Sequence, residues 1–169
     1  MDKKVLWAVL VLLGIVVVFA VLNAGEHEER LASQRERKVF IDFGEERITV
    51  NYDDILTLEQ HEFEETLRSS EAPPRDKVFK GVRMQDLLDS VDIPAEEINQ
   101  VITKSVDAYT VALSQEEVLS EDNVYVIHEI DGETLISREE GGWGPFMIVI
   151  REETFAQRWN RYLMEIEVR

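Results

Sequence analysis

A glycine-rich loop gives way to unbroken apolar residues in the stretch Glu139–Ile150 (EEGGWGPFMIVI). Five consecutive apolar residues, β-branched toward their end and preceded by glycines and a proline, predict a strand buried on both faces. Gly141, Gly142 and Gly144 permit positive φ angles or a close backbone approach in the loop. The loop also carries Trp143, and it is either a ligand pocket or a turn whose tryptophan caps the core. The pattern alone leaves both readings open.

Alternating apolar and polar residues predict seven further short strands. They cover Val39–Phe43, Arg47–Tyr52, His61–Leu67, Val101–Val106, Tyr109–Leu113, Asn123–Ile130 and Tyr162–Val168. His61–Leu67 is expected at a sheet edge because a glutamate falls on its apolar side. The dipeptide Asp131-Gly132 predicts a tight turn after its strand.

Helical features are fewer and shorter. Apolar residues spaced three or four apart predict one helix, and a Ser-x-x-Glu capping box predicts a second. The expected helical segments are Val82–Val91, Ser114–Leu119, a turn capped by Asp53 or Asp54, and a turn at Thr154–Arg158. Arg68–Lys77 is predicted to be a loop because serines, two adjacent prolines and charges dominate it. Short strands with brief helices predict an α+β domain with mixed β-sheets.

The N-terminal segment contains the uncharged run Val5–Leu22. As a helix it would extend about 27 Å, close to the roughly 30 Å hydrocarbon core of a bilayer. Lys3 and Lys4 predict a cytoplasmic N-terminus and an extracytoplasmic remainder. A cleaved secretory signal is the alternative, but the run is long for one and the cleavage-site pattern is poor. We predict that residues 1–24 comprise a cytoplasmic N-terminus and a transmembrane helix that anchors the chain in the cell membrane.

Residues 25–38 are polar, mixed in charge and without an apolar face. They predict a tether, helical or not, before a folded domain at residues 39–169. The net charge of −17 argues against nucleic-acid binding, because phosphates would be repelled. The chain has no cysteine, which excludes disulfides, zinc–cysteine sites, iron–sulfur clusters and thiolate nucleophiles.

Familiar catalytic signatures are absent from the sequence. His61-Glu62 and His27-Glu28 begin like a zincin motif, but neither has a second histidine four residues on. No nucleophile elbow or Walker loop occurs, and Gly142-Trp143-Gly144 precedes a strand instead of joining a strand to a helix. We therefore predict neither catalytic residues nor metal ligands, and expect His61 and His128 to be structural or surface residues.

Taken in order, several segments resemble the sulfite oxidase-type molybdopterin-binding domain. They are DDILTL with HEFEETLRSS, FKGV with MQDLLDSVDI, SVDAYTVAL with SQEEVL, HEIDGETL through GGWGP, and the ending RWNRYLMEIEV. The resemblance covers about residues 37–169. It implies the fold of that family for the domain that follows the transmembrane helix.

The resemblance also implies a site, and the chain departs from the family within it. In catalytic members the loop after Thr-Leu carries a cysteine whose thiolate binds molybdenum. Here Ser69 falls near that position, and a hydroxyl is a poor replacement for a soft thiolate. The implied cofactor-binding residues are Arg68, Ser69, Ser70, Arg75, Tyr109, Gly141, Gly142 and Trp143, with Lys80 and Lys104 as further basic candidates.

The alternatives for these residues are ordinary structural roles. Tyr109 and Trp143 would stack on a pterin ring or close the pocket, whereas packing in the core is the favoured interpretation for Tyr109. Arg68 and Arg75 would bind a phosphate or form surface ion pairs.

We therefore predict a membrane-anchored, extracytoplasmic binding or accessory module without molybdenum catalysis. Its partner would be a pterin-like small molecule, with molybdopterin itself a candidate, or a membrane redox protein. Two alternatives stay open. One is a molybdopterin-dependent oxidoreductase that uses Ser69 or no protein ligand, and the other is a structural partner domain that docks through its acidic face.

Overall fold

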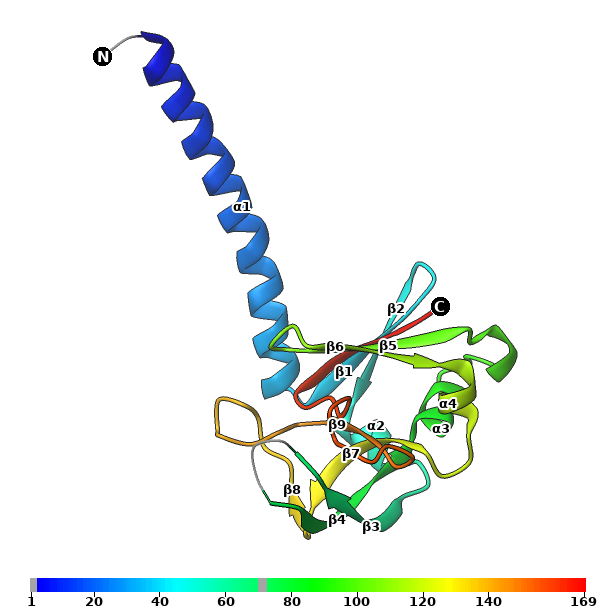
Figure 1. Cartoon of the computed structure of the whole chain (residues 1–169). Helices are drawn as coiled ribbons and strands as arrows, with labels where there is room; N and C mark the ends of the chain where they lie inside the picture. The colour runs from blue at the N-terminus through cyan, green and yellow to red at the C-terminus, as the bar shows by residue number, and fades with distance from the viewer. Residues whose placement is uncertain (1–2, 70–72) are drawn as a thin grey trace. The chain divides into compact units, whose positions relative to one another are not determined.

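A computed structural model describes residues 3–69 and 73–169 of the chain (Figure 1). It divides into two compact units, residues 1–32 and Ser33–Arg169. Helix α1 (Lys3–Arg35) begins in the first unit. The side chains described between Val5 and Val18 are exposed, Trp7 by 71%.

Within the described residues, no helix combines the length and the apolar composition needed to cross a membrane. The predicted anchor Val5–Leu22 lies partly outside the described part, because the side chains of residues 19–22 are not included in it. Its insertion into a membrane stays a prediction.

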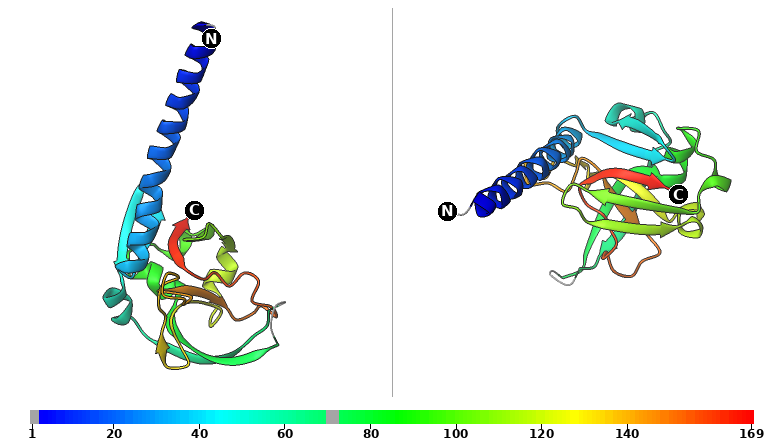
Figure 2. Two further views of the ribbon diagram at one scale, coloured as in Figure 1. Left: turned by 90° about the vertical axis from the view of Figure 1, so that its left-hand side faces the viewer. Right: turned by 90° about the horizontal axis from the view of Figure 1, so that it is seen from above.

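Five strands of the second unit form sheet A, in the order β2-β1-β10-β5-β6. They are β1 (Lys38–Phe43), β2 (Glu46–Asn51), β5 (Gln100–Ser105), β6 (Thr110–Ser114) and β10 (Leu163–Val168). The C-terminal strand β10 lies at the centre, parallel to β1 and antiparallel to β5, as the right-hand view of Figure 2 shows. The two ends of the domain are thus tied together by backbone hydrogen bonds.

The remaining strands form sheet B, in the order β3-β4-β7-β8, with β9 also paired to β7. They are β3 (His61–Leu67), β4 (Arg75–Arg83), β7 (Val124–Ile130), β8 (Glu133–Thr134) and β9 (Met147–Ile150). Asp131 and Gly132 join β7 to β8 with φ angles of 54° and 79°. Two positive φ angles are what a two-residue hairpin turn of this kind requires, so the predicted tight turn is confirmed.

The core lies between the two sheets (Figure 1). Strand β5 alternates buried and half-buried residues, which places one face toward the core. All four residues of β9 are buried, as the apolar run predicts. However, β9 pairs with β7 alone among the described strands. Its other side is closed by loop backbone, because Ile148 N–H donates to the Asn160 carbonyl over 2.8 Å.

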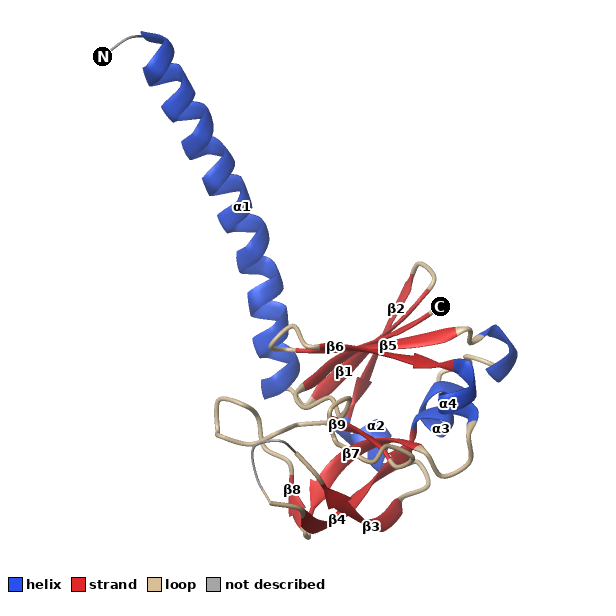
Figure 3. Ribbon diagram, in the orientation of Figure 1, coloured by secondary structure: helices blue, strands red, loops and turns tan. Residues whose placement is uncertain are grey.

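Short helices cover parts of this core, as the blue segments of Figure 3 show. They are α2 (Tyr52–Leu56), α3 (Met84–Asp89), α4 (Gln115–Leu119) and the 3₁₀ helix η1 (Ala95–Glu97). The capping box of α4 is confirmed: Glu117 N–H donates to Ser114 Oγ over 3.2 Å, and Ser114 N–H donates to the Glu117 carboxylate over 2.8 Å. The cap of α2 was assigned wrongly, because Asn51 is its N-cap and Asp54 is the third helical residue.

Two other predictions are wrong. Residues Arg75–Lys77 belong to strand β4, since Arg75 pairs with Leu67 of β3 and the prolines lie before the paired region. Thr154–Arg158 forms turns and bends instead of a helical turn. Ala156 N–H there donates to the Arg68 carbonyl over 3.0 Å, so this donor is satisfied across the fold.

Sheet A ends at strand β6, whose exposed residues are uncharged. Arg158 Nη1 donates to the carbonyl of Ala112 in this strand over 3.3 Å. The same guanidinium forms ion pairs with Glu117 and Glu153. A cation held by two carboxylates therefore covers part of this sheet edge.

Candidate functional site

The loop between β8 and β9, residues 135–145, folds back on itself through its glycines. Gly144 N–H donates to the Ile136 carbonyl over 2.8 Å, and Gly141 has a φ of +85°. A Cβ on Gly142 would lie 2.3 Å from the Ile136 carbonyl oxygen, and one on Gly144 would lie 2.6 Å from the Leu135 Cβ. The sequence-based expectation of positive φ or close approach in this loop is therefore confirmed.

Trp143 is half-buried and packs against the core. The guanidinium carbon of Arg161 lies 3.8 Å from the centre of a Trp143 ring. The segment that carries Arg161 is fixed by Asn160, which is fully buried and donates to the carbonyl and the hydroxyl of Thr103 over 3.1 and 2.9 Å. A planar ligand would meet an indole face that a cation already covers.

A first pocket of about 420 Å³, here called the hairpin pocket, lies between this loop and the β7–β8 hairpin. Its lining residues are Lys77, Ile130, Asp131, Glu133, Thr134, Leu135, Ile136, Gly141, Gly142 and Trp143. Lys77 forms an ion pair with Asp131 at its rim. The Asp131 carboxylate accepts hydrogen bonds from the Lys77 ammonium and from the Val78 N–H. These two hydrogen bonds lower the pKa of Asp131, so its carboxyl is ionised at neutral pH.

A second pocket of about 490 Å³, here called the arginine pocket, lies against the other side of the loop. Its lining residues are Gln34, Arg35, Arg37, Thr134, Leu135, Ile136, Ser137, Glu139, Glu140 and Pro145. The Arg37 guanidinium carbon lies 3.5 Å from the centre of the Tyr52 ring, in a cation–π contact. Gln34 is 3% exposed, and its Oε1 accepts a hydrogen bond from Arg138 N–H over 3.3 Å.

Glu140 lies at the arginine pocket but is bonded to its own loop. Its carboxylate accepts hydrogen bonds from the Ser137 hydroxyl over 2.7 Å and from Ser137 N–H over 3.1 Å. The hydrogen bond from the Ser137 side chain, with that from the backbone, lowers the pKa of Glu140. Glu140 is therefore an ionised carboxylate at the pocket that is bonded to Ser137.

The predicted site residues fall into two groups. Gly141, Gly142 and Trp143 line the hairpin pocket. Arg68 and Tyr109 instead contact the segment Phe155–Gln157: Ala156 N–H donates to the Arg68 carbonyl, and the Tyr109 hydroxyl donates to the Gln157 carbonyl over 2.6 Å. Neither Arg68 nor Tyr109 is among the residues that line the two pockets described above.

The other predicted residues are at the surface or outside the described part. Ser69 and Arg75 are exposed, and Ser70 lies outside the described residues. Tyr109 is 45% exposed, so core packing, the favoured interpretation for this residue, is wrong. Its hydroxyl is satisfied by a backbone carbonyl at the surface instead of by the core.

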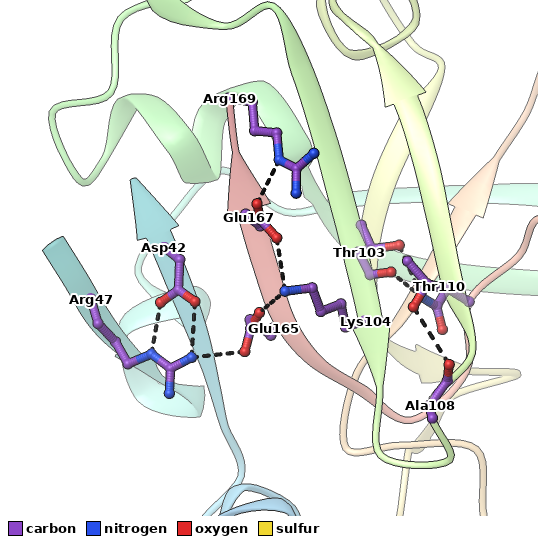
Figure 4. Close-up of polar contacts among 10 residues, drawn as sticks. Asp42, Arg47, Thr103, Lys104, Ala108, Thr110, Glu165, Glu167 and Arg169 are labelled. Carbon is purple, nitrogen blue, oxygen red and sulfur yellow. Dashed lines mark hydrogen bonds and ion pairs between the residues drawn. The ribbon is translucent and has the colours of Figure 1, made fainter. Parts of the chain in front are cut away.

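The two lysines considered as phosphate ligands are already paired. Lys80 lies 3.8 Å from a carboxylate oxygen of Glu129. Lys104 contacts Glu165 and Glu167 on the outer face of sheet A (Figure 4). Burial lowers the pKa of Lys104, but hydrogen bonds to these two carboxylates outweigh it and raise the pKa above its usual value.

The described residues do not offer a molybdenum ion the ligands that it needs. No cysteine exists in the chain, and the described part contains no group of three or more His, Asp or Glu residues arranged to hold a metal ion. Ser69, at the position that the family resemblance assigns to the thiolate, is exposed and carries a hard hydroxyl. The metal of the catalytic family therefore does not fit the side chains present.

Sequence reasoning missed Gln34, Arg37, Ser137 and Glu140. The hydrogen bonds between Ser137 and Glu140 could have been predicted, because these two residues have the spacing of a capping box. Gln34 and Arg37 lie in a segment without an apolar face, which gave no reason to expect burial.

Comparison with known proteins places this geometry in context. The family model of the oxidoreductase molybdopterin binding domain matches residues 38–169. A search of curated proteins finds no match.

Among solved structures, the sulfane dehydrogenase SoxCD from Paracoccus pantotrophus is similar, with a TM-score of 0.62 and 14% sequence identity. The match covers 78% of this chain and 37% of the SoxCD chain, so this chain spans little more than a third of that protein's length. At this identity the likeness concerns the fold.

Proposed function

This chain belongs to the oxidoreductase molybdopterin binding domain family, and we propose that it is a membrane-anchored, extracytoplasmic binding or accessory module without molybdenum catalysis. The absence of any cysteine is the observation behind the proposed lack of molybdenum catalysis. Molybdenum in the catalytic members is expected to bind a soft thiolate, and Ser69 supplies a hydroxyl with a pKa far above neutral. The fold would then retain a cavity without its redox centre.

The ligand that we propose is a pterin-like small molecule in the hairpin pocket. This pocket brings together an apolar wall, which includes Trp143, and the charged pair of Lys77 and Asp131. Ligand sites commonly combine apolar walls with a few placed polar groups of this kind. Arg161 lies over a ring of Trp143 and would hold that indole in place at the pocket.

The anchor and the location rest on the N-terminal segment. Val5–Leu22 is uncharged, and its described side chains are exposed, which suits contact with lipid. Lys3 and Lys4 favour a cytoplasmic N-terminus. The folded domain would then lie outside the cytoplasm, where a membrane redox protein is the proposed partner.

Quantifying molybdenum and pterin in the purified full chain tests the proposed function. We expect molybdenum far below one atom per chain, with pterin retained, because the chain lacks the thiolate that would hold the metal. Ser69→Ala is the matched variant and should leave both contents unchanged. One molybdenum per chain, lost in Ser69→Ala, would instead identify a molybdopterin-dependent oxidoreductase. Protein free of both would favour a structural partner domain.

Fractionation of cells that express the full chain tests the anchor. We expect the chain to stay with membranes after alkaline carbonate washing, and the domain to be cleaved by protease added from the extracytoplasmic side. Release by carbonate, or protection from that protease, would contradict the proposed topology.

A further inference from the structure

The arginine pocket contains three buried nitrogen donors without an acceptor. They are Gln34 Nε2, Arg37 Nε and Arg37 Nη2, none of which has a hydrogen-bond partner in the part of the chain that the structure describes. A buried donor without an acceptor costs the desolvation free energy of that group, and the cost is larger for a charged group. Three such donors beside one pocket indicate that an acceptor belongs there.

The two orphaned nitrogens of Arg37 have a particular geometry. Nε and Nη2 lie on the same side of the guanidinium and point their N–H bonds in parallel, which matches the two oxygens of a carboxylate or a phosphate. The cation–π contact with Tyr52 fixes the plane of the group and leaves its edge free.

The same fork is occupied elsewhere in this chain. Arg47 donates from Nε and Nη2 to the two carboxylate oxygens of Asp42 over 2.7 and 2.9 Å (Figure 4). Arg83 does the same to Asp86 over 2.8 and 2.9 Å. Arg37 is thus a third fork of this kind, and it lacks its oxyanion within the described residues.

The orientation of Gln34 supports the same conclusion. Its Oε1 must face Arg138, because Arg138 N–H donates to it, and the Nε2 group therefore points away without an acceptor. Exchanging the oxygen and nitrogen of this amide would only set two donors against each other. Gln34 is 3% exposed, so bulk water does not satisfy its Nε2 group.

The carboxylates of Glu139 and Glu140, which line the pocket, have other partners in the described structure. Glu140 is bonded to Ser137, and Glu139 lies 3.6 Å from Arg35 in an ion pair. We propose that the arginine pocket is a binding site for an oxyanion, a carboxylate or a phosphate group, held by the Arg37 fork and by Gln34 Nε2. This site is separate from the hairpin pocket and does not depend on the proposed function.

A phosphate group has two sources, a free anion and a lipid headgroup. The chemistry of the contact is the same for both. Inorganic phosphate and acetate represent the free anion, and dihexanoyl phosphatidic acid represents the headgroup, with dihexanoyl phosphatidylcholine as its zwitterionic counterpart.

Calorimetric titration of the full chain in non-ionic detergent micelles tests the site. Wild-type protein should bind at least one of the anionic probes saturably, and the Arg37 Nε–H signal in a ¹H–¹⁵N spectrum should shift on binding. Arg37→Lys keeps the charge but loses the fork, and should weaken binding at least about tenfold, the effect of one charge-assisted hydrogen bond. Preference for phosphatidic acid over inorganic phosphate would assign the site to lipid, and the reverse to a free anion.

Arg47→Lys is the matched control, because it alters a fork that Asp42 already occupies. It should bind the probes as the wild type does. If Arg37→Lys proves unfolded by circular dichroism, Gln34→Met provides a second variant and should weaken binding several-fold. Equal affinity in wild type and a folded Arg37→Lys, or no saturable binding of any probe by the wild type, would overturn the proposal.

Discussion

On the outer face of sheet A, charged side chains of both signs form one continuous series of ion pairs (Figure 4). The series runs through Asp42, Arg47, Glu165, Lys104, Glu167 and Arg169. In the arginine pocket, by contrast, the fork of Arg37 lacks an acceptor among the described residues. The first arrangement is complete among the described residues, whereas the second lacks an acceptor there, which is the observation behind the proposed oxyanion site.

The difference shows why a count of arginines says little about function. Arg37 and Arg47 carry the same charge and present the same pair of nitrogens. Arg47 is opposite a carboxylate on the neighbouring strand, since Asp42 pairs with Arg47 in the β1–β2 hairpin. Arg37 lies just before β1, at a position where the fold places an aromatic ring and a cavity instead.

Disturbing the loop of residues 135–145, whose Ile136 lines the arginine pocket, should have the largest effect on stability. Gly142→Ala would place a Cβ 2.3 Å from the Ile136 carbonyl oxygen, so the loop must rearrange. We expect a loss of about 3 kcal/mol in the free energy of unfolding, measured with urea by tryptophan fluorescence. Phosphate binding should be lost with it.

Gly44→Ala is the matched control for that substitution. Gly44 has a φ of +62° but nothing within 4 Å of an added Cβ, so a loss of only about 1 kcal/mol is expected, from backbone strain alone. Equal losses in the two variants, with phosphate binding intact in Gly142→Ala, would show that the closed loop does not shape the pocket.

Removing Arg47, whose guanidinium already binds Asp42, should lower the free energy of unfolding by a smaller amount that depends on pH. The hydrogen bond from Arg47, opposed by burial, lowers the pKa of Asp42. The stability from this pair is therefore present above the ordinary carboxyl pKa and is lost as the pH falls through the lowered value. Arg47→Met should cost roughly 1 kcal/mol at pH 7, and the difference should shrink toward acid pH.

Arg37→Met supplies the other half of this comparison, because no carboxylate occupies its fork among the described residues. Urea unfolding between pH 7 and pH 3 should show a flatter difference from wild type for Arg37→Met than for Arg47→Met. An equally steep difference would mean that a carboxylate pairs with Arg37 in solution.

The smallest expected effect is a change in the pKa of His128 when an anion binds to Arg37. Burial lowers its pKa, and the positive charge of Arg37 contributes in the same direction. Folding therefore favours neutral His128, and its contribution to stability is lost as the pH falls through the lowered pKa. An anion on Arg37 should raise this pKa slightly, as measured by NMR titration with and without phosphate. No phosphate effect is expected in Arg37→Met, and an equal effect there would place the anion elsewhere.

Much of the fold could be predicted from local patterns. The buried strand at Met147–Ile150, the turn at Asp131-Gly132 and the capping box of α4 depend on residues close in sequence. The start of β4 could not be predicted this way. Arg75–Lys77 is exposed or half-buried, charged, and preceded by two prolines, and it becomes a strand because β3 pairs with it.

The candidate site was less accessible to such reasoning. The glycines and Trp143 identified the loop, since their chemistry constrains the backbone wherever they occur. The burial of Gln34 is a property of the fold: a residue in a polar segment becomes buried when residues 135–145 fold against it. No periodicity in residues 25–38 encodes that contact.

The guanidinium of Arg158, which bonds to the Ala112 carbonyl in β6, has a consequence for association between molecules. An uncharged edge strand such as β6 is a template on which a neighbouring chain can add a strand and begin to aggregate. A strand from another molecule would first have to displace the Arg158 guanidinium, which Glu117 and Glu153 hold in place by ion pairs. One arginine thus helps to keep copies of this chain from pairing edge to edge through β6.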